Sequence, residues 1–144
     1  MPRSPEPIAN PTIALRNAII EQESNGHFWI VNSDSGALGI GQVMPENLKA
    51  WSEEALGYSI SKEEFLKNPQ LQTQIIDYKL AQYWQRALRD SGGKPEESVR
   101  RVASQWYSGD PNLYESTTPQ FYNGQVYPSV ANYTLAVLEK YRSQ

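Results

Sequence analysis

Apolar residues recur at helical spacing along most of the chain. The longest such stripe runs from residue 70 to residue 89 and contains Leu71, Ile75, Tyr78, Leu80, Tyr83, Trp84 and Leu88. A shorter stripe over residues 12–24 contains Leu15, Ala18, Ile19 and Ile20. This spacing places apolar side chains on one face of a helix. We predict these two helices and further helices over residues 46–56, 96–106 and 130–141.

Turn and capping residues mark the ends of these helices. Asn10-Pro11 and Asn68-Pro69 each place a capping asparagine before a proline in the first helical turn. Ser61-Lys62-Glu63-Glu64 fits a capping box. Asn25-Gly26 is suited to end the first helix, since glycine adopts the left-handed conformation at a helix C-terminus.

Three segments lack a helical pattern. Residues 27–40 combine strand-forming residues with Asn, Ser, Asp and Gly, which predicts a short hairpin or an irregular loop. Residues 111–126 are rich in Asn, Tyr, Ser, Thr and Pro and are predicted to be a surface loop. Residues 1–10 hold three prolines and are predicted to be an extended lead-in. We therefore expect one mainly α domain, residues 11–144, with about six to seven helices.

Composition excludes several classes of site. The chain has 144 residues, no cysteine and a single histidine, so a disulfide framework, a cysteine zinc site and a multi-histidine metal site are excluded. We expect no metal and no cofactor. A net charge of −3 disfavours nucleic-acid binding. No apolar run approaches the roughly 18 residues of a membrane span, residues 1–7 do not resemble a secretory signal, and we expect a monomer.

Glu23 is the carboxylate best placed for chemistry. It follows Ile19 by four residues and Ile20 by three, so it lies on or beside the apolar stripe, whereas Glu21 points elsewhere. A carboxylate there would be partly desolvated, which raises its pKa toward the value that a general acid needs. The alternative is a surface glutamate at the edge of the helix.

The motifs around Glu23 resemble those of a known family. Glu23-Ser24 is followed, after Ser33-Asp34-Ser35, by the run Gly36-Ala37-Leu38-Gly39-Ile40-Gly41-Gln42-Val43-Met44-Pro45. This resembles the signature of the lytic transglycosylase SLT domain, a lysozyme-like family related to goose-type lysozymes. Three further motifs follow in the family's order, namely Asn68-Pro69-x-Leu71, Trp106-Tyr107-Ser108-Gly109 and Asn132-Tyr133. The resemblance covers about residues 12–141.

The resemblance implies a lysozyme-like fold and a set of site residues. Glu23 would be the single catalytic acid and base, oriented by Ser24, with the Tyr133 hydroxyl nearby. The residues expected to bind substrate are Ser24, Ser33, Gly39, Gln42, Met44, Trp106, Tyr107 and Tyr133. Among these, Gln42 and Met44 would line the glycan cleft, and the glycines would let the backbone approach the sugar. For Met44, Trp106 and Tyr133, core packing is the alternative.

The chain departs from the family pattern at three places. Gly41 stands where methionine is usual, which predicts a wider cleft. Tyr107 stands where asparagine is common, and Ser129-Val130-Ala131 replaces a frequent Glu-Thr-Arg. The last change puts a charged contact to the peptide stem in doubt.

The function implied is cleavage of the MurNAc–GlcNAc β-1,4 bond of peptidoglycan with formation of 1,6-anhydroMurNAc. The substrate N-acetyl group would replace a second carboxylate. One alternative is a hydrolytic, lysozyme-type reaction in which Asp34 positions a water, and the other role for Asp34 is a turn residue that bonds locally. Chitin oligomers are a possible secondary substrate. An alternative of another class is a non-catalytic glycan-binding or structural domain. The substrate implies action outside the cytoplasm, in the periplasm, the cell wall or a phage particle.

Overall fold

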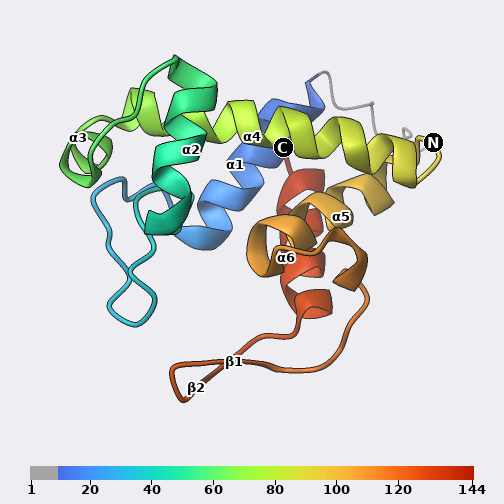
Figure 1. Cartoon of the computed structure of the whole chain (residues 1–144). Helices are drawn as coiled ribbons and strands as arrows, with labels where there is room; N and C mark the ends of the chain where they lie inside the picture. Colours follow the sequence, from blue (N-terminus) through green and yellow to red (C-terminus); the bar gives the residue numbers. More distant parts are fainter. Residues whose placement is uncertain (1–9) are drawn as a thin grey trace.

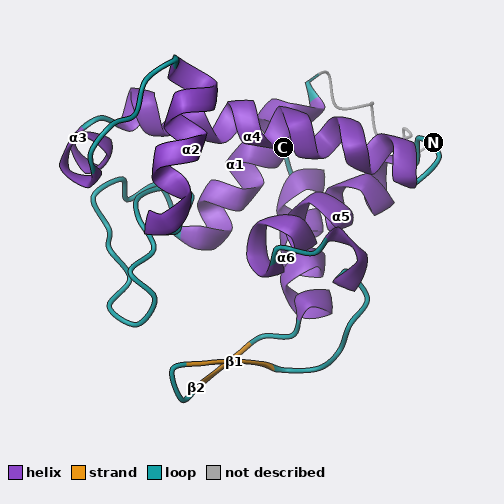
Figure 2. Cartoon of the chain, in the orientation of Figure 1, coloured by secondary structure: helices purple, strands orange, loops and turns teal. Residues whose placement is uncertain are grey.

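A computed structural model describes residues 10–144 of the chain. The extended lead-in predicted for residues 1–10 lies outside the described residues, apart from Asn10, which caps the first helix. Over the described range the protein is mainly helical, as predicted (Figure 2). The elements, in chain order, are α1 (Pro11–Glu23), α2 (Pro45–Leu56), α3 (Lys62–Lys67), α4 (Pro69–Asp90), α5 (Pro95–Ser108), the 3-10 helix η1 (Pro111–Leu113), β1 (Gln120–Tyr122), β2 (Gln125–Tyr127) and α6 (Val130–Arg142).

The helices begin where the sequence places capping residues. The Asn10 side chain accepts a hydrogen bond from the backbone of Ile13, and the Asn68 side chain accepts two from the first turn of α4. The hydroxyl of Ser61 accepts from Glu64 N at 3.1 Å, which is half of the predicted capping box. These bonds satisfy backbone donors that the helices leave unpaired.

Two groups of helices flank the C-terminal end of α1. Figure 1 shows α4 running along the top of the molecule with α1 beneath it, α2 and α3 at one end, and α5 and α6 at the other. The core joins them through side chains that are almost completely buried: Leu15 and Ile19 of α1, Phe65 of α3, Ile75, Ile76 and Leu80 of α4, Val99 and Val102 of α5, and Val137 of α6. Helix α1 packs against α4 and α6. Figure 1 places its C-terminal end, where Glu23 is the last residue, between the two groups.

The segment 24–44 is an irregular loop, which is one of the two structures predicted for residues 27–40. It contains only isolated β-bridges, from Leu38 to Val31 and to Val43. The fully buried side chain of Gln72 holds the loop from inside. Its Oε1 accepts from Ile40 N at 2.8 Å, and its Nε2 donates to the carbonyl of Phe28 at 2.8 Å. One α4 side chain therefore fixes both limbs of the loop.

The prediction of a plain surface loop over residues 111–126 is wrong in part. The segment contains η1 and an antiparallel hairpin in which Gln120 pairs with Tyr127 and Tyr122 with Gln125. Asn123 and Gly124 form its turn with φ of 48° and 76°. Two successive residues with positive φ match the twist of a two-residue hairpin, and Asn-Gly is the preferred pair for that turn.

Candidate active site

Glu23 and Tyr133 meet where α1 and α6 pack together. The Tyr133 hydroxyl donates a hydrogen bond to Glu23 Oε2 at 2.9 Å. No hydrogen bond to Glu23 Oε1 is present within residues 10–144, and no buried side-chain oxygen in that range lacks a partner. It follows that Oε1 is reached by solvent. One carboxyl oxygen is thus fixed by the protein and the other is open.

The environment of Glu23 raises its pKa from 4.5 to about 7. Burial is the larger cause, because removal from water disfavours the charged carboxylate. The hydrogen bond from Tyr133 acts in the opposite direction and lowers the pKa, since it stabilises the charged form. The predicted desolvation of this residue is therefore confirmed. A carboxyl with a pKa near 7 can both donate and accept a proton at neutral pH.

Two tyrosines form a stacked pair beside Glu23. The rings of Tyr107 and Tyr133 are nearly parallel, at 8°, with centroids 4.2 Å apart. Burial and the charge of Glu23 raise the pKa of Tyr107 to about 12 and that of Tyr133 well above its usual value. Both hydroxyls are therefore protonated at neutral pH. Tyr133 is 4% exposed, so its role as a donor to Glu23 is combined with core packing.

Ser24 fixes the end of α1 to the irregular loop. Its buried hydroxyl donates to the carbonyl of Ile40 at 2.7 Å and accepts from Gly26 N at 3.1 Å. The hydroxyl does not bond to the Glu23 carboxyl. These hydrogen bonds hold the backbone next to Glu23, and the predicted orienting role and substrate contact of Ser24 stay predictions.

Two of the three glycines of the signature, Gly39 and Gly41, are required by contacts within the protein. Gly39 has φ of +71°, and a side chain there would clash with the amide of Gln72. At Gly41, a Cβ would lie 2.7 Å from Cδ1 of Ile76 and 3.2 Å from Cζ2 of Trp106. These contacts account for both glycines independently of any approach to a sugar.

Trp106 packs against the signature loop. Its Nε1 donates to the carbonyl of Gly41 at 2.9 Å, and its ring lies 5.3 Å from that of Trp51 and 6.3 Å from that of Tyr83. The side chain is half-buried, so one part of it is packed and another part reaches solvent. Its place in the wall of a glycan site stays a prediction.

The remaining predicted residues are spread along the loop. Gln42, with φ of 52°, donates from Nε2 to the carbonyl of Gly39 at 3.0 Å. Met44 is half-buried at the start of α2, and Ser33 is exposed in the turn before Gly36. Contact of these three side chains with a glycan stays a prediction.

Asp34 is exposed and binds the hairpin. Its Oδ2 accepts from the Tyr127 hydroxyl at 3.1 Å, and its backbone carbonyl accepts from the Asn123 amide at 2.8 Å. Both partners lie about ninety residues further along the chain. Asp34 therefore joins two distant segments, a role that neither sequence interpretation included.

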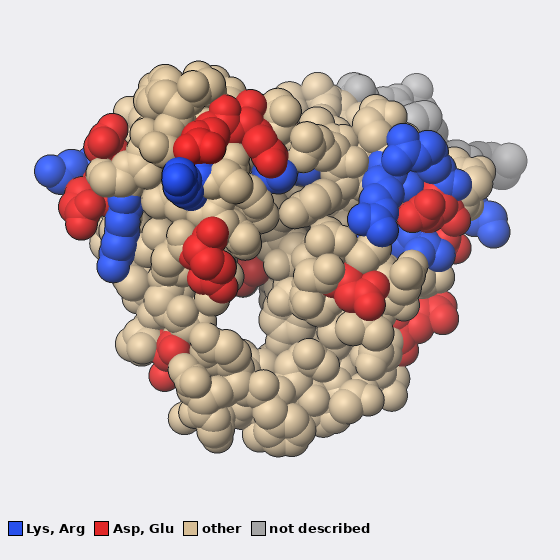
Figure 3. All heavy atoms as spheres, in the orientation of Figure 1, with Lys and Arg blue, Asp and Glu red and all other residues tan. Residues whose placement is uncertain are grey.

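The surface is open between the two groups of helices. Figure 3 shows an opening that passes through the molecule, and the same view in Figure 1 places it above the hairpin, between the loop 24–44 and helices α5 and α6.

Across residues 10–144 there is no group of three or more His, Cys, Asp or Glu that could hold a metal ion. In the same range, none of the helices has the length and apolarity required to cross a membrane.

One of three comparisons with known proteins identifies the family of this chain. The family model of the Transglycosylase SLT domain matches residues 9–100, which is more than half of the chain. The chain belongs to the transglycosylase SLT family. Members of this family cleave glycosidic bonds in peptidoglycan. No curated protein and no solved structure matched the chain.

The SLT match includes Glu23 and the whole signature loop, but it ends before Trp106, Tyr107 and Tyr133. The structure brings Tyr107 and Tyr133 into contact with each other and Tyr133 into contact with Glu23, so the candidate site includes residues beyond the matched range. Sequence reasoning missed Gln72, whose polar side chain at a buried α4 position was an available signal. It also missed the hairpin, for which Asn123-Gly124 was the signal.

Proposed function

We propose that this SLT domain is a peptidoglycan lytic transglycosylase that acts on the MurNAc–GlcNAc β-1,4 bond with Glu23 as its single acid and base. The observation that carries the proposal is the state of Glu23. Its pKa is raised to about 7 by burial, and no neighbouring carboxylate contributes to that value. Glycosidases with two carboxylates place them roughly 5–9.5 Å apart, and a charge at the near end of that range would raise the pKa further.

In the first step, protonated Glu23 donates its proton to the glycosidic oxygen. The bond from that oxygen to the anomeric carbon of MurNAc breaks, and the GlcNAc hydroxyl leaves. The N-acetyl carbonyl oxygen of MurNAc attacks the anomeric carbon and takes the place of a second carboxylate. Glu23 is now a carboxylate, and the hydrogen bond from Tyr133 stabilises the new charge.

In the second step, the Glu23 carboxylate accepts the proton of the MurNAc C6 hydroxyl. The C6 oxygen attacks the anomeric carbon, the N-acetyl oxygen leaves, and a 1,6-anhydro ring closes. Glu23 regains its proton, and no water is consumed. A pKa near 7 suits a group that acts first as an acid and then as a base.

Two other functions lead to different results. A hydrolase would deliver water to the anomeric carbon, and Asp34 is the residue that would position it; here its carboxylate already accepts from Tyr127. A non-catalytic glycan-binding or structural domain would have no use for an acid with a raised pKa. Chitin oligomers share the β-1,4 bond and the N-acetyl group but lack the lactyl and peptide groups. Whether they are cleaved therefore tests whether the site requires the lactyl and peptide groups of its substrate.

The direct test is release of soluble muropeptides from purified peptidoglycan by the wild type and a Glu23→Gln variant. Glu21→Gln is the matched control, because Glu21 is an exposed glutamate on the same helix. We expect the wild type and the control to release muropeptides and Glu23→Gln to retain glycan binding without release. Equal release by all three proteins would overturn the proposal, and binding without release by all three would favour the non-catalytic function.

A further inference from the structure

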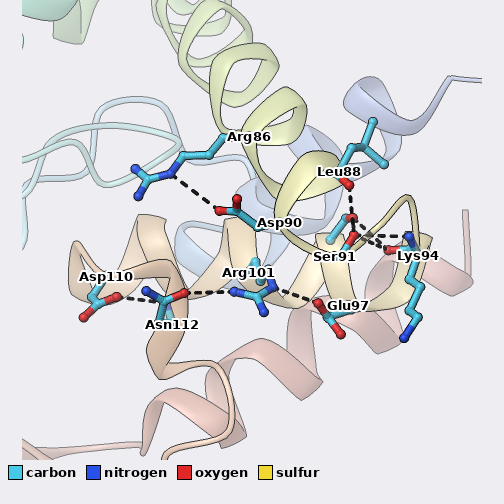
Figure 4. Close-up of polar contacts among 10 residues, drawn as sticks. Arg86, Leu88, Asp90, Ser91, Lys94, Glu97, Arg101, Asp110 and Asn112 are labelled. Atoms are coloured by element: carbon cyan, nitrogen blue, oxygen red, sulfur yellow. Dashed lines mark hydrogen bonds and ion pairs between the residues drawn. The ribbon is translucent and has the colours of Figure 1, made fainter.

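Residues 117–128 form a segment, here called the strap, whose base is firmly anchored. Figure 4 shows Arg101 between Glu97 and Asn112, with Asp110 beside Asn112. Arg101 donates to Glu97 at 2.9 Å and to Asn112 at 2.9 Å, which fixes the chain just after α5. At the other side of the base, Ala131 N donates to the carbonyl of Ser116 at 2.9 Å. The strap therefore leaves and re-enters the helical body at fixed points.

Beyond its base, the strap is poorly packed. Its exposed side chains include Phe121 at 72%, Val126 at 66% and Tyr122 at 46%. A two-stranded hairpin alone is marginally stable in water. The position of its tip therefore depends on the two hydrogen bonds from Asn123 and Tyr127 to Asp34.

These contacts complete a closed circuit that passes through Glu23. Glu23 bonds to Tyr133, which stacks on Tyr107. The Tyr107 hydroxyl donates to the carbonyl of Pro128 at 2.8 Å, at the end of the strap. The strap residue before Pro128 is Tyr127, whose hydroxyl donates a hydrogen bond to Asp34 Oδ2. The chain from Asp34 back to Glu23 closes the circuit. The opening in Figure 3 lies in the same region, between the loop 24–44, the hairpin and helices α5 and α6.

The strap has the chemistry of a glycan contact surface. Residues 117–128 contain no charged side chain, and they include tyrosine, glutamine and asparagine. Aromatic rings and amides suit sugars, which combine apolar faces with hydroxyl groups. No side chain of this segment could form an ion pair with a charged ligand.

We propose that the strap encircles a single glycan strand and that Tyr127 and Asn123 latch it to Asp34 while the strand is bound at Glu23. A strand in the middle of a cross-linked wall enters when the latch opens. Each cut creates a free end, so the bound strand then leaves either through that end or when the latch opens again, and the closed latch slows its dissociation. The enzyme thus makes several cuts in one strand before it dissociates. This inference rests on the proposed function for its substrate, a peptidoglycan strand.

A disulfide across the latch tests the encirclement directly. The chain has no cysteine, so Asp34→Cys combined with Asn123→Cys creates the sole possible pair. The Asn123 side chain donates to the backbone carbonyl of Asp34 at 2.8 Å, so these two positions are the closest contact between the strap tip and the loop on which to place the pair. Both changes are made in the Glu23→Gln background to prevent cleavage. The protein is mixed with sacculi, oxidised, washed at high salt and sedimented, and disulfide formation is checked by mass spectrometry.

We expect protein oxidised after mixing to remain with the sacculi and to be released by a reductant. Protein oxidised before mixing should be retained about tenfold less, because a closed ring is threaded only from a free strand end. The single variant Asn123→Cys should be washed off in both orders. Equal retention in both orders of oxidation, or loss of the protein oxidised after mixing, would overturn the inference.

A milder change tests the latch in the active enzyme. Tyr127→Phe with Asn123→Gly removes both hydrogen bonds, and glycine accepts the φ of 48° at residue 123. Tyr58→Phe is the matched control, because Tyr58 is an exposed tyrosine outside the strap whose hydroxyl makes no hydrogen bond within residues 10–144. We expect about tenfold faster dissociation from glycan strands for the double variant and no change for the control. Equal effects of the two would count against the latch.

The cross-linking experiment and the cleavage assay distinguish failure of the strap inference from failure of the proposed function. If the wild type releases no muropeptides but the oxidised variant is trapped, the proposed function is wrong and the encircling strap stands. If muropeptides are released and no trapping occurs, the strap inference is wrong and the function stands.

Discussion

The Tyr133 hydroxyl donates to Glu23 Oε2 at 2.9 Å across 110 residues of chain. The bond joins the end of α1 to α6 and opposes the effect of burial on the pKa of Glu23. Because it favours the carboxylate, it would stabilise Glu23 in the proposed reaction once the proton has been given to the leaving group. The same bond therefore sets both the geometry and the titration of the proposed acid.

Tyr133→Phe should shift the pH dependence of activity. In the wild type, kcat/KM should fall as pH rises through about 7, where Glu23 loses the proton that it must donate. Without the hydrogen bond the pKa of Glu23 rises, so the fall in kcat/KM, here called the alkaline limb of the pH profile, should move to higher pH. The rate at the optimum should fall roughly tenfold or more, since a bond to a charged group is lost. The measurement is kcat/KM on soluble glycan fragments against pH.

Tyr107→Phe is the control for that profile. Its hydroxyl donates to the carbonyl of Pro128 and not to Glu23, so the limb should stay in place. If the Tyr133→Phe profile coincides with that of the wild type, Glu23 does not set the limb and the assignment fails.

Glu23→Gln should stabilise the fold at high pH. The pKa of Glu23 is about 7 in the folded state and 4.5 in the reference state, so the native protein binds the proton more tightly. Stability that the wild type has below pH 4.5 is lost as pH rises toward 7. Glutamine cannot ionise and avoids this loss. The variant should gain up to about 3 kcal/mol relative to the wild type between pH 4 and pH 8.

Urea unfolding at the two pH values measures this difference. Glu21→Gln, on the same helix but exposed, gives the baseline for loss of one carboxylate. A gain for Glu23→Gln that is the same at both pH values would contradict the raised pKa.

Gly39→Ala should cost more than Gly26→Ala. Both glycines have positive φ, at +71° and +85°, and alanine there costs about 1–2 kcal/mol. Around Gly26 there is no atom within 4 Å, whereas at Gly39 the new side chain meets Gln72. We expect an additional loss of about 1–3 kcal/mol at Gly39 in urea unfolding. Equal losses would mean that the contact with Gln72 does not constrain the loop.

Gln72→Met should destabilise the protein by about 3 kcal/mol. The change keeps the volume but leaves Ile40 N and the carbonyl of Phe28 without their partner, and the carbonyl of Phe65 keeps only the bond from Asn68 N. Gln74→Met, at an exposed position of the same helix, should change stability by less than about 0.5 kcal/mol. The comparison is made by urea unfolding, and similar values for the two variants would remove Gln72 as the support of the signature loop.

The helices were predictable because their signals are local. Asn10, Ser61 and Asn68 cap helices within three residues of themselves, and apolar spacing reports the buried face of a single helix. The same spacing placed Glu23 at the edge of the core. Its raised pKa follows from that position.

The rest of the site depends on contacts that are distant in sequence. Asp34 meets Tyr127 across 93 residues and Gln72 meets Ile40 across 32, and no local pattern records either pair. The hairpin is different, because Asn123-Gly124 is a local turn signal. It was missed because the flanking strands have three residues each and show no clear alternation.

The masses of the soluble products from purified peptidoglycan, for the wild type and Glu23→Gln, test the central claim most directly. We predict muropeptides that are lighter by one water than hydrolysis products, as 1,6-anhydro ends require, and we predict that Glu23→Gln forms none. Products of full hydrolytic mass would contradict the transglycosylase reaction and would make water positioning by Asp34 the next hypothesis. Anhydro products from Glu23→Gln at the wild-type rate would contradict the role of Glu23 itself.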